Sequence, residues 1–241
     1  MSEFSQAPYD VRFDWGLSGL AALRECASFV IVDVLSFSTC VSIAVDRGAA
    51  VLPFRWDAEA ARVFASEQGA VLAARRSEPG AYSLSPQSLL SLPEGTRLVL
   101  PSPNGSTLAT VAASMGSVIA GCFRNRSAAA QFAATTRSPV AVIAAGEKWS
   151  DGSIRPCLED LCGAGAIIAA LPGSCSPEAS AAAAAFSAMG SQVEERLLDC
   201  ASGRELVERG FAEDVRLAAA LDVSSSVPTL CAGVFVRAAA T

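Results

Sequence analysis

An acid and a group of hydroxyl residues meet where an apolar run ends, in the stretch VIVDVLSFSTC at residues 30–40. The apolar residues stop at Asp33, and Ser36, Ser38 and Thr39 follow at once. A carboxylate at the end of a buried strand is a candidate metal ligand, and hydroxyls and amides at the start of a helix bind phosphate well. A simpler interpretation is that Ser36 or Ser38 caps a helix while Asp33 interacts favourably with the helix dipole.

Polar side chains follow three other apolar runs as well. They are Asn104 and Gly105 after the first run, Arg124, Asn125 and Arg126 after the second, and Glu147 after the third. Ligands of open parallel sheets lie outside the carboxyl ends of the strands, so we expect these residues to share one rim with Asp33. Each asparagine can alternatively be a helix cap, and Gly105 can simply serve a turn.

Two adjacent acids, Glu159 and Asp160, occur in the stretch CLEDLCGAGAII. Neighbouring residues of a helix point in different directions, so the two carboxylates do not share a face. In the first turn of a helix both would be favoured by the dipole. They are equally candidates for metal ligands, because charged residues make up only 17% of this chain.

The chain has no histidine, and this limits the chemistry open to it. Catalytic triads, Cys–His pairs and histidine-ligated zinc or iron sites are excluded in their usual forms. Acid–base and metal chemistry would rest on carboxylates, hydroxyls, thiols, lysine or arginine. A carboxylate site favours a hard cation, so we expect Mg²⁺ as the cofactor. Eight cysteines are scattered without a C-x-x-C pair, so we interpret them mostly as small buried apolar residues.

Three common phosphate-site signatures are missing or incomplete. Position 35 is Leu, so Asp33 does not begin a D-x-D pair. Cys231 and Arg237 have the C-x5-R spacing of cysteine phosphatases, but the residues between them are apolar and strand-like. Neither a P-loop nor a G-x-G-x-x-G stretch is present.

Composition also indicates the kind of partner. A net charge of −6 argues against a nucleic-acid surface, and no apolar run is long enough for a membrane span. The N-terminal stretch lacks the basic and apolar regions of a secretory signal, so we expect a cytoplasmic protein. We expect neither nucleic acid nor a membrane as a partner. A homodimer is one option for its assembly.

Apolar runs alternate with segments of helical character along the chain. Strands are expected at 29–33, 49–54, 70–74, 97–101, 117–121, 140–146 and 231–236. Helices are expected at 38–48, 57–69, 104–116, 125–137, 157–171, 177–190 and 211–222, with long loops at 77–95 and 148–156. This alternation predicts one α/β domain over residues 1–241, with a layered, largely parallel or mixed sheet flanked by helices.

Taken in order, several of these stretches resemble the 2-phosphosulfolactate phosphatase family. They are VIVDVLSFSTC, PNGST, GCFRNRSA, AAGEKWSDGSIRPCLEDLCGAGAI and ERGFAEDVRLAAALD. The resemblance implies an α/β fold and Mg²⁺-dependent hydrolysis of a phosphate ester on a small sulfonated acid, a step in coenzyme M synthesis. It also implies site roles for Asp33, Asn104, Gly105, Asn125, Glu147, Glu159 and Asp160.

The chain departs from the expected family pattern at two arginines. Ser36 stands where we expect one arginine, and Thr107 where we expect another. The stretch SLSPQSL has no counterpart of an expected asparagine. Phosphate and sulfonate groups both favour guanidinium partners. We therefore expect either that Arg124 and Arg126 compensate or that they bind a different anion.

The combined interpretation is a Mg²⁺-dependent phosphatase for 2-phosphosulfolactate or a related small phosphomonoester. The expected metal ligands are Asp33, Glu147, Glu159 and Asp160, of which the first three are also the candidate catalytic groups. The expected substrate-binding residues are Ser36, Ser38, Thr39, Asn104, Gly105, Arg124, Asn125 and Arg126. Asp33 as a phosphorylated nucleophile stays open. The alternative function is a non-catalytic anion-binding or oligomeric protein that has kept the fold.

Overall fold

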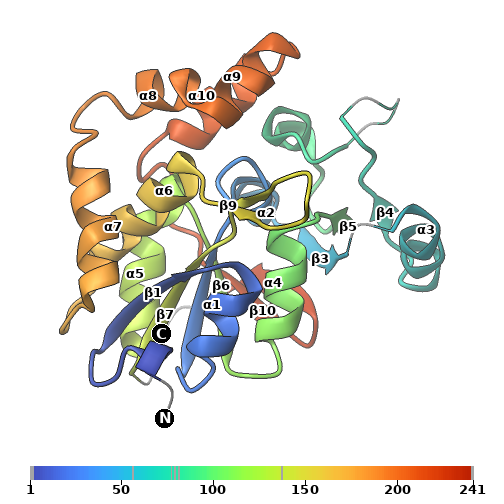
Figure 1. Cartoon of the computed structure of the whole chain (residues 1–241). Helices are drawn as coiled ribbons and strands as arrows, with labels where there is room; N and C mark the ends of the chain where they lie inside the picture. Colours follow the sequence, from blue (N-terminus) through green and yellow to red (C-terminus); the bar gives the residue numbers. More distant parts are fainter. Residues whose placement is uncertain are drawn as a thin grey trace.

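A nine-stranded mixed sheet forms the centre of the computed structural model, which describes residues 3–55, 57–76, 78, 80, 82–136 and 138–239 (Figure 1). In sheet order the strands are β1 (Val11–Trp15), β7 (Val140–Ala144), β2 (Ser28–Val32), β6 (Ser117–Gly121), β10 (Pro228–Cys231), β11 (Val234–Arg237), β3 (Ala50–Phe54), β5 (Arg97–Pro101) and β4 (Val71–Leu72). Helices flank this sheet, and the predicted α/β class is confirmed.

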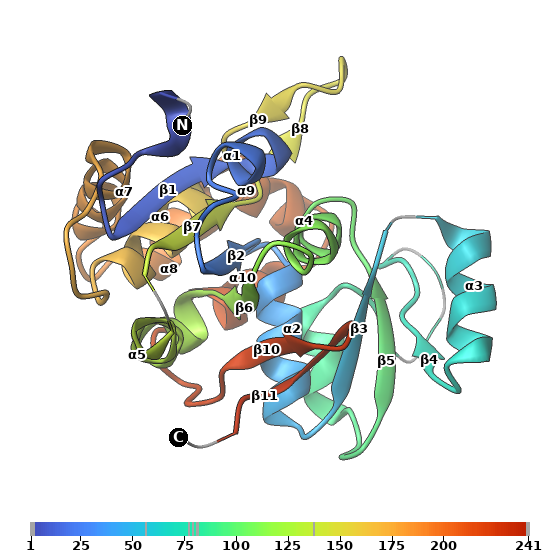
Figure 2. The ribbon, with the colours of Figure 1, turned by 90° about the horizontal axis from the view of Figure 1, so that it is seen from below.

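The sheet consists of two parallel groups joined by a hairpin. Strands β1, β7, β2 and β6 are mutually parallel, and so are β3, β5 and β4. Three successive antiparallel pairings, through β10 and β11, separate β6 from β3, so the chain direction reverses between the groups. Figure 2 shows this hairpin lying between them.

The hairpin corrects one predicted strand. The apolar run 231–236 forms the end of β10, a turn and most of β11, because Ala232 and Gly233 adopt positive φ angles of 50° and 81°. An apolar run contains no signal that distinguishes one strand from two around such a turn. Because the two groups run in opposite directions, the carboxyl ends of β2 and β5 do not share one edge of a wholly parallel sheet. The sequence-based reason for placing Asn104 beside Asp33 assumed such an edge, and that reason is wrong.

Helices cover both faces of the first parallel group. On one face lie α5 (Arg126–Thr135), α6 (Leu158–Ile168) and α7 (Pro177–Ser187), and on the other lie α1 (Gly16–Ala22), α2 (Phe37–Asp46) and α4 (Gly105–Ala112). Strand β2 contributes Val30 and Val32 to the first core and Phe29 and Ile31 to the second. This two-sided burial explains why its sequence is a continuous apolar run.

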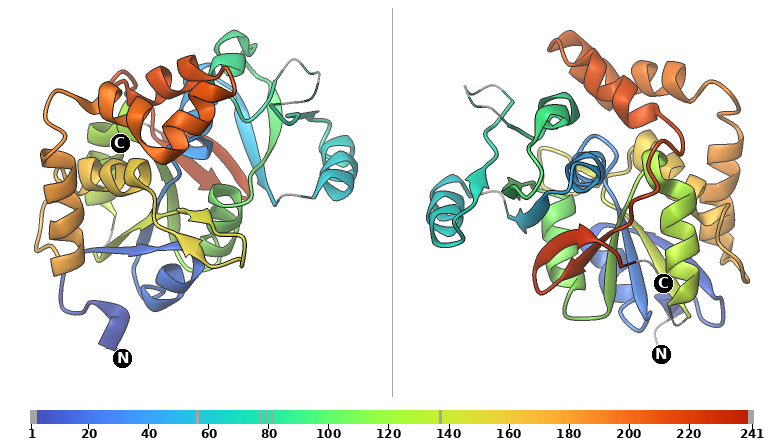
Figure 3. Two further views of the ribbon diagram at one scale, coloured as in Figure 1. Left: turned by 45° about the horizontal axis from the view of Figure 1, so that its top comes forward. Right: turned by 180° about the vertical axis from the view of Figure 1, so that it is seen from behind.

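The remaining helices lie at the margins of the sheet. Helix α3 (Ala58–Glu67) packs on the small cluster around β3 and β5, on the side of the molecule away from α7 (Figures 1 and 2). Helices α8 (Val193–Asp199), α9 (Ala201–Glu208) and α10 (Ala212–Ala219) pack together at one end (Figure 3). None of the helices in the described ranges is long and apolar enough to cross a membrane.

Several elements differ from the sequence-based expectation. Strand β1 and helices α1, α8 and α9 were not expected; in β1, Arg12 and Asp14 interrupt the apolar pattern. The loop at 148–156 belongs to a hairpin of β8 (Glu147–Lys148) and β9 (Ile154–Arg155), and the loop at 77–95 contains a 3-10 helix, Pro86–Ser91. Short 3-10 helices also span Glu3–Ser5 and Phe123–Asn125. Residues 77, 79 and 81 of the expected loop and residue 137 of the expected helix lie outside the described residues.

Candidate active site

Asp33 connects the first residues of two helices. Its carboxylate accepts one hydrogen bond from the backbone N–H of Phe37 in α2, at 3.1 Å, and another from the N–H of Gly105 in α4, at 2.9 Å. The residue is 7% exposed. Asp33 therefore links the turn after β2 to the helix that follows β5, although β5 belongs to the other parallel group.

Gly105 is required by this close approach. A Cβ atom at position 105 would lie 2.8 Å from a carboxylate oxygen of Asp33 and closer still to the ring of Phe37. Only glycine lets the start of α4 approach the carboxylate this closely. The structure thereby explains one half of the Asn-Gly pair that the sequence singled out.

The hydroxyls of Ser38 and Thr39 stabilise the turn between β2 and α2. Ser38 donates to the carbonyl of Ile31 at 2.9 Å and accepts from the N–H of Asp33 at 3.0 Å. Thr39 donates to the carbonyl of Val34 at 2.8 Å. Both side chains are fully buried. In this structure their protons are used to order the turn that carries Asp33.

Asp160 ties the same turn to the end of β7. One carboxylate oxygen accepts from the N–H of Val34 and the other from the N–H of Gly146, each at 2.8 Å. Gly146 has a φ of 65°, which a residue with a side chain rarely adopts. Asp160 lies in the first turn of α6 and is 4% exposed. It therefore orders the turns that present Asp33 and Glu147.

Two glutamates complete the group of four acids. Glu159 is 3% exposed, and the thiol of Cys200 donates to its carboxylate at 3.5 Å. Glu147 is the first residue of β8, and the side-chain amide of Asn104 donates to its carboxylate at 3.3 Å. The strand ends after β2, β5 and β7 thus bring Asp33, Asn104 and Glu147 to one place.

Burial and mutual repulsion raise the pKa values of three of these acids. Burial is the main reason why the pKa of Asp33 is raised; the negative charge of Glu159 adds to the rise, and two backbone N–H groups oppose it. Burial also raises the pKa of Asp160 well above its usual range, followed by repulsion from Asp33 and Glu159. The pKa of Glu147 is raised by burial and then by Asp33. A cation or added protons would relieve this repulsion.

The carboxylate oxygens of the four acids suit a hard cation that also binds water or phosphate oxygens. Within the described residues, no three or more carboxylates or thiols converge as ready-made metal ligands. Both oxygens of Asp33 and of Asp160 already accept backbone N–H groups. Mg²⁺ is commonly held by one or two carboxylates together with water and phosphate oxygens, and four interacting acids provide that number of ligands.

A pocket opens beside Glu147 and Asn104. It has a volume of about 410 Å³, and its lining includes Lys148, Trp15 and Ile154 from the surrounding elements. The β8–β9 hairpin forms one wall, with Glu147 at its base. A small substrate entering here would meet a carboxylate, an amide and the cationic side chain of Lys148.

The three polar residues after β6 have other partners. The buried amide of Asn125 accepts from the N–H of Cys122 at 3.0 Å and donates to the carbonyls of Ala120 and Ser226. Arg124 donates to the carbonyl of Leu217 at 3.0 Å. Their hydrogen bonds bring neither residue to the four acids, and the substrate-binding role expected of both stays a prediction.

Arg126 likewise points to other groups. Its guanidinium forms a 2.7 Å ion pair with Asp222 and lies 5.2 Å from the centre of the Phe186 ring. The first turn of α5 aims this side chain at α7 and at the segment that follows α10. Its substrate-binding role also stays a prediction.

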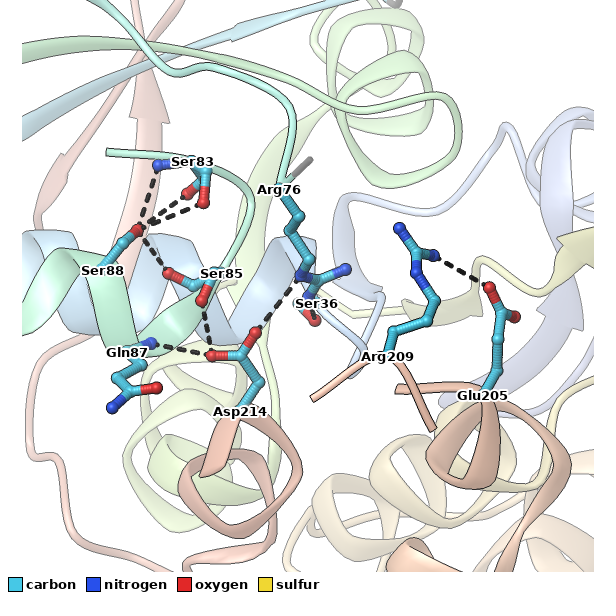
Figure 4. A network of polar contacts seen from close by, with 9 residues as sticks. All are labelled: Ser36, Arg76, Ser83, Ser85, Gln87, Ser88, Glu205, Arg209 and Asp214. Carbon is cyan, nitrogen blue, oxygen red and sulfur yellow. Dashed lines mark hydrogen bonds and ion pairs between the residues drawn. The ribbon is translucent and has the colours of Figure 1, made fainter. Parts of the chain in front are cut away.

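A residue that the sequence did not single out, Arg76, contacts the turn after β2. It donates to the hydroxyl of Ser36 at 2.6 Å and forms an ion pair with Asp214 at 3.2 Å (Figure 4). The available signal was the Arg75–Arg76 pair just after the short strand β4, a polar strand end like the others. The hydroxyl of Ser36 thus accepts a cationic donor and makes no cap to α2.

The fold and site define an α/β enzyme with buried acids and helix N-termini at the ends of its strands. A family model described as 2-phosphosulpholactate phosphatase matches residues 18–233. The chain is 30% identical over 202 residues to the 2-phosphosulfolactate phosphatase of Methanothermobacter thermautotrophicus, covering 83% of this chain and 84% of that protein. It is 28% identical over 219 residues to a probable 2-phosphosulfolactate phosphatase of Thermotoga petrophila, covering 88% and 92%. The chain belongs to the 2-phosphosulpholactate phosphatase family, which confirms the resemblance, and it is a phosphoric monoester hydrolase.

Proposed function

We propose that this enzyme hydrolyses 2-phosphosulfolactate or a related small anionic phosphomonoester to the alcohol and phosphate, with Mg²⁺ as its cofactor. The observation that supports this most directly is the group of four interacting acids beside the N-termini of α2 and α4. Helix N-termini favour a phosphoryl group, and the acids favour the cation that accompanies it. The family match and the named relatives support the substrate class.

The acids divide into three roles in this proposal. Asp160 orders the turns after β2 and β7 through two backbone N–H groups. Asp33 and Glu159 are the candidate ligands for Mg²⁺ in this proposal, since one or two carboxylates suffice and Glu147 is needed for proton transfer. The ion, when bound, would polarise the phosphoryl oxygens and acidify a water molecule. The amide of Asn104, already bonded to Glu147, orients that carboxylate, and both residues line the pocket.

Proton transfer falls to a carboxylate because the chain has no histidine. We assign the general base to Glu147, since it lines the pocket and burial raises its pKa toward the range of an effective base. It takes a proton from the attacking water as the new P–O bond forms and the bond to the alcohol oxygen breaks. The same proton then passes to the leaving alkoxide, so that the products are the alcohol and inorganic phosphate.

Phosphate release from a panel of phosphomonoesters tests this function. We expect turnover of 2-phosphosulfolactate with Mg²⁺ or Mn²⁺ and a loss of about two orders of magnitude or more in excess EDTA, restored by added Mg²⁺. Zinc should not be needed, because a site without histidine or a thiol cluster is a poor zinc site. Full activity in excess chelator would refute the metal requirement. No release from any ester would favour the alternative, a non-catalytic anion-binding protein.

A further inference from the structure

Arg76 is held in place by partners from distant parts of the chain. Its terminal Nη2 atom donates to the hydroxyl of Ser36, and its Nε atom pairs with Asp214. The guanidinium carbon lies 5.5 Å from the centre of the Phe211 ring. Figure 4 shows the guanidinium between Ser36 and Asp214. A long side chain that is only 12% exposed has thereby lost most of its freedom before any ligand arrives.

Asp214 has the properties of a residue that positions Arg76. It is fully buried and accepts from the hydroxyl of Ser85 at 2.6 Å and from the N–H of Gln87 at 3.0 Å, besides Arg76. The donors from Ser85 and Gln87 offset part of the negative charge of Asp214, so Arg76 is not the only group that compensates it. Within the described part of the chain, the second terminal nitrogen of Arg76, Nη1, has no hydrogen-bond partner. A guanidinium carries five N–H donors, so donors remain for an anion.

The position of Arg76 places a positive charge at the edge of the acidic group. Ser36 precedes the first residue of α2 and lies three positions after Asp33. The charge of Arg76 lowers the pKa of the Asp33 carboxyl, against the larger effect of burial. Arg209 lies near the same Phe211 ring, 5.9 Å from its centre, and is paired with Glu205 (Figure 4). Two guanidinium groups therefore lie near the Phe211 ring.

We propose that Arg76 binds the anionic group of the substrate that is not hydrolysed, a carboxylate or a sulfonate. This inference rests on the function proposed above. The four acids repel a second anion unless a cation receives it, and Arg124 and Arg126 are bonded to the carbonyl of Leu217 and to Asp222. Arg76 is preorganised, retains unused donors and adjoins the N-terminus of α2, which itself favours negative charge.

Substrate comparison tests the proposal, with Arg62→Ala as a control. Arg62, like Arg76, pairs with an acid, Glu59, but it lies on α3, outside the acidic group. The substrates are 2-phosphosulfolactate, 2-phospholactate and phenyl phosphate, which carry two, one and no anionic groups besides the phosphate. We expect Arg76→Ala to lower kcat/KM for 2-phosphosulfolactate roughly 10- to 150-fold, and to change it less than about threefold for phenyl phosphate. Arg62→Ala should show no such difference.

The 2-phospholactate measurement identifies the group that is bound. A loss as large as for 2-phosphosulfolactate assigns the carboxylate to Arg76, whereas a loss confined to 2-phosphosulfolactate assigns the sulfonate. Equal losses on all three substrates, or no loss on any, would overturn the proposal; the first result would indicate a phosphoryl contact or a purely structural role. A wild-type enzyme that hydrolyses none of the three would instead refute the proposed function.

A second variant and a binding measurement cover the case in which Arg76→Ala does not fold. Arg76→Gln keeps a side-chain amide that can donate to Ser36 or Asp214, but it removes the positive charge. Sulfolactate, which lacks the phosphate, should inhibit phenyl phosphate hydrolysis by the wild-type enzyme. We expect its inhibition constant to rise at least about tenfold in Arg76→Gln and to stay unchanged in Arg62→Ala. An unchanged constant in Arg76→Gln would contradict the proposal.

Discussion

Replacement of Asp33 by Asn separates two roles of its carboxylate: bonding to the starts of α2 and α4, and taking part in the reaction. Asp33→Asn keeps one oxygen acceptor but places an amide N–H₂ against the N–H of Phe37 or of Gly105. Losing a hydrogen bond to a charged group costs roughly 1.5–3 kcal/mol. Removing a buried charge also ends the repulsion from Glu159 and Asp160, which acts in the stabilising direction. We expect the free energy of unfolding to fall by about 1–3 kcal/mol.

For a chain of this length, that loss corresponds to a decrease in Tm of roughly 2–12 °C, so the variant stays folded at 25 °C. Turnover should fall by roughly 10²- to 10⁴-fold if Asp33 takes part in the chemistry. Thermal unfolding by circular dichroism and phosphate release under saturating Mg²⁺ measure the two effects on one sample.

Asp57 offers a matched control for this experiment. It also accepts a backbone N–H of a helix start, that of Ala60 at 3.0 Å, but it lies at α3, outside the acidic group. Asp57→Asn should leave kcat/KM unchanged. If Asp33→Asn lowered Tm while kcat/KM stayed within about threefold of wild type, Asp33 would be a helix-capping residue only, and the catalytic assignment would be refuted.

Three further predictions follow from contacts around the site and from one ion pair. Gly105→Ala should displace the start of α4 from Asp33, lowering the free energy of unfolding by about 1–3 kcal/mol and reducing kcat/KM; unchanged kinetics would contradict the close approach. Asn125→Ala should destabilise the protein by roughly 1–3 kcal/mol in denaturant titrations, since its buried amide bonds to Cys122, Ala120 and Ser226; an unchanged stability would contradict this, and a raised KM would support the expected substrate contact. Partial burial raises the pKa of Asp222, but hydrogen bonds and the charge of Arg126 outweigh it and leave the pKa below its ordinary value. The contribution of Asp222 to stability is therefore present above about pH 3.9 and is lost as the pH falls through the lowered pKa. Asp222→Asn should reduce the loss of Tm between pH 5 and pH 3. An identical loss of Tm in the wild-type and variant proteins would contradict this.

The parts of the fold that were predicted correctly are those in which burial determines the residue types. Strands β2, β5, β6 and β7 are buried on both faces, and this produced the continuous apolar runs from which they were inferred. Strand β1 lies at the edge of the sheet, and its Arg12 is buried because it donates to the carbonyls of Tyr9 and Ser5. Arg12 and Asp14 interrupt the apolar run, so this strand was missed.

In the candidate site, too, some residues could be predicted from the sequence and others could not. The structure places Asp33, Asn104 and Glu147 in contact with each other or with common neighbours, as expected, although Asn104 follows a strand of the opposite direction and the assumed shared edge does not exist. It does not bring Arg126 there, because the pairing with Asp222 depends on how distant segments pack. Arg76 was missed for the same reason: Ser36 is 40 residues away from it and Asp214 is 138 residues away.

The β10–β11 hairpin has a consequence for how the molecule assembles. It is the piece of sheet between β6 and β3, and it lies late in the sequence, at residues 228–237. Until that segment has been synthesised, β6 and β3 each present an unpaired edge with open N–H and C=O groups. Such edges promote intermolecular pairing, and long-range strand pairings form slowly. During synthesis, nascent chains lacking the hairpin should therefore depend on chaperones, and C-terminal truncations through residue 228 should aggregate even though every acid of the site remains.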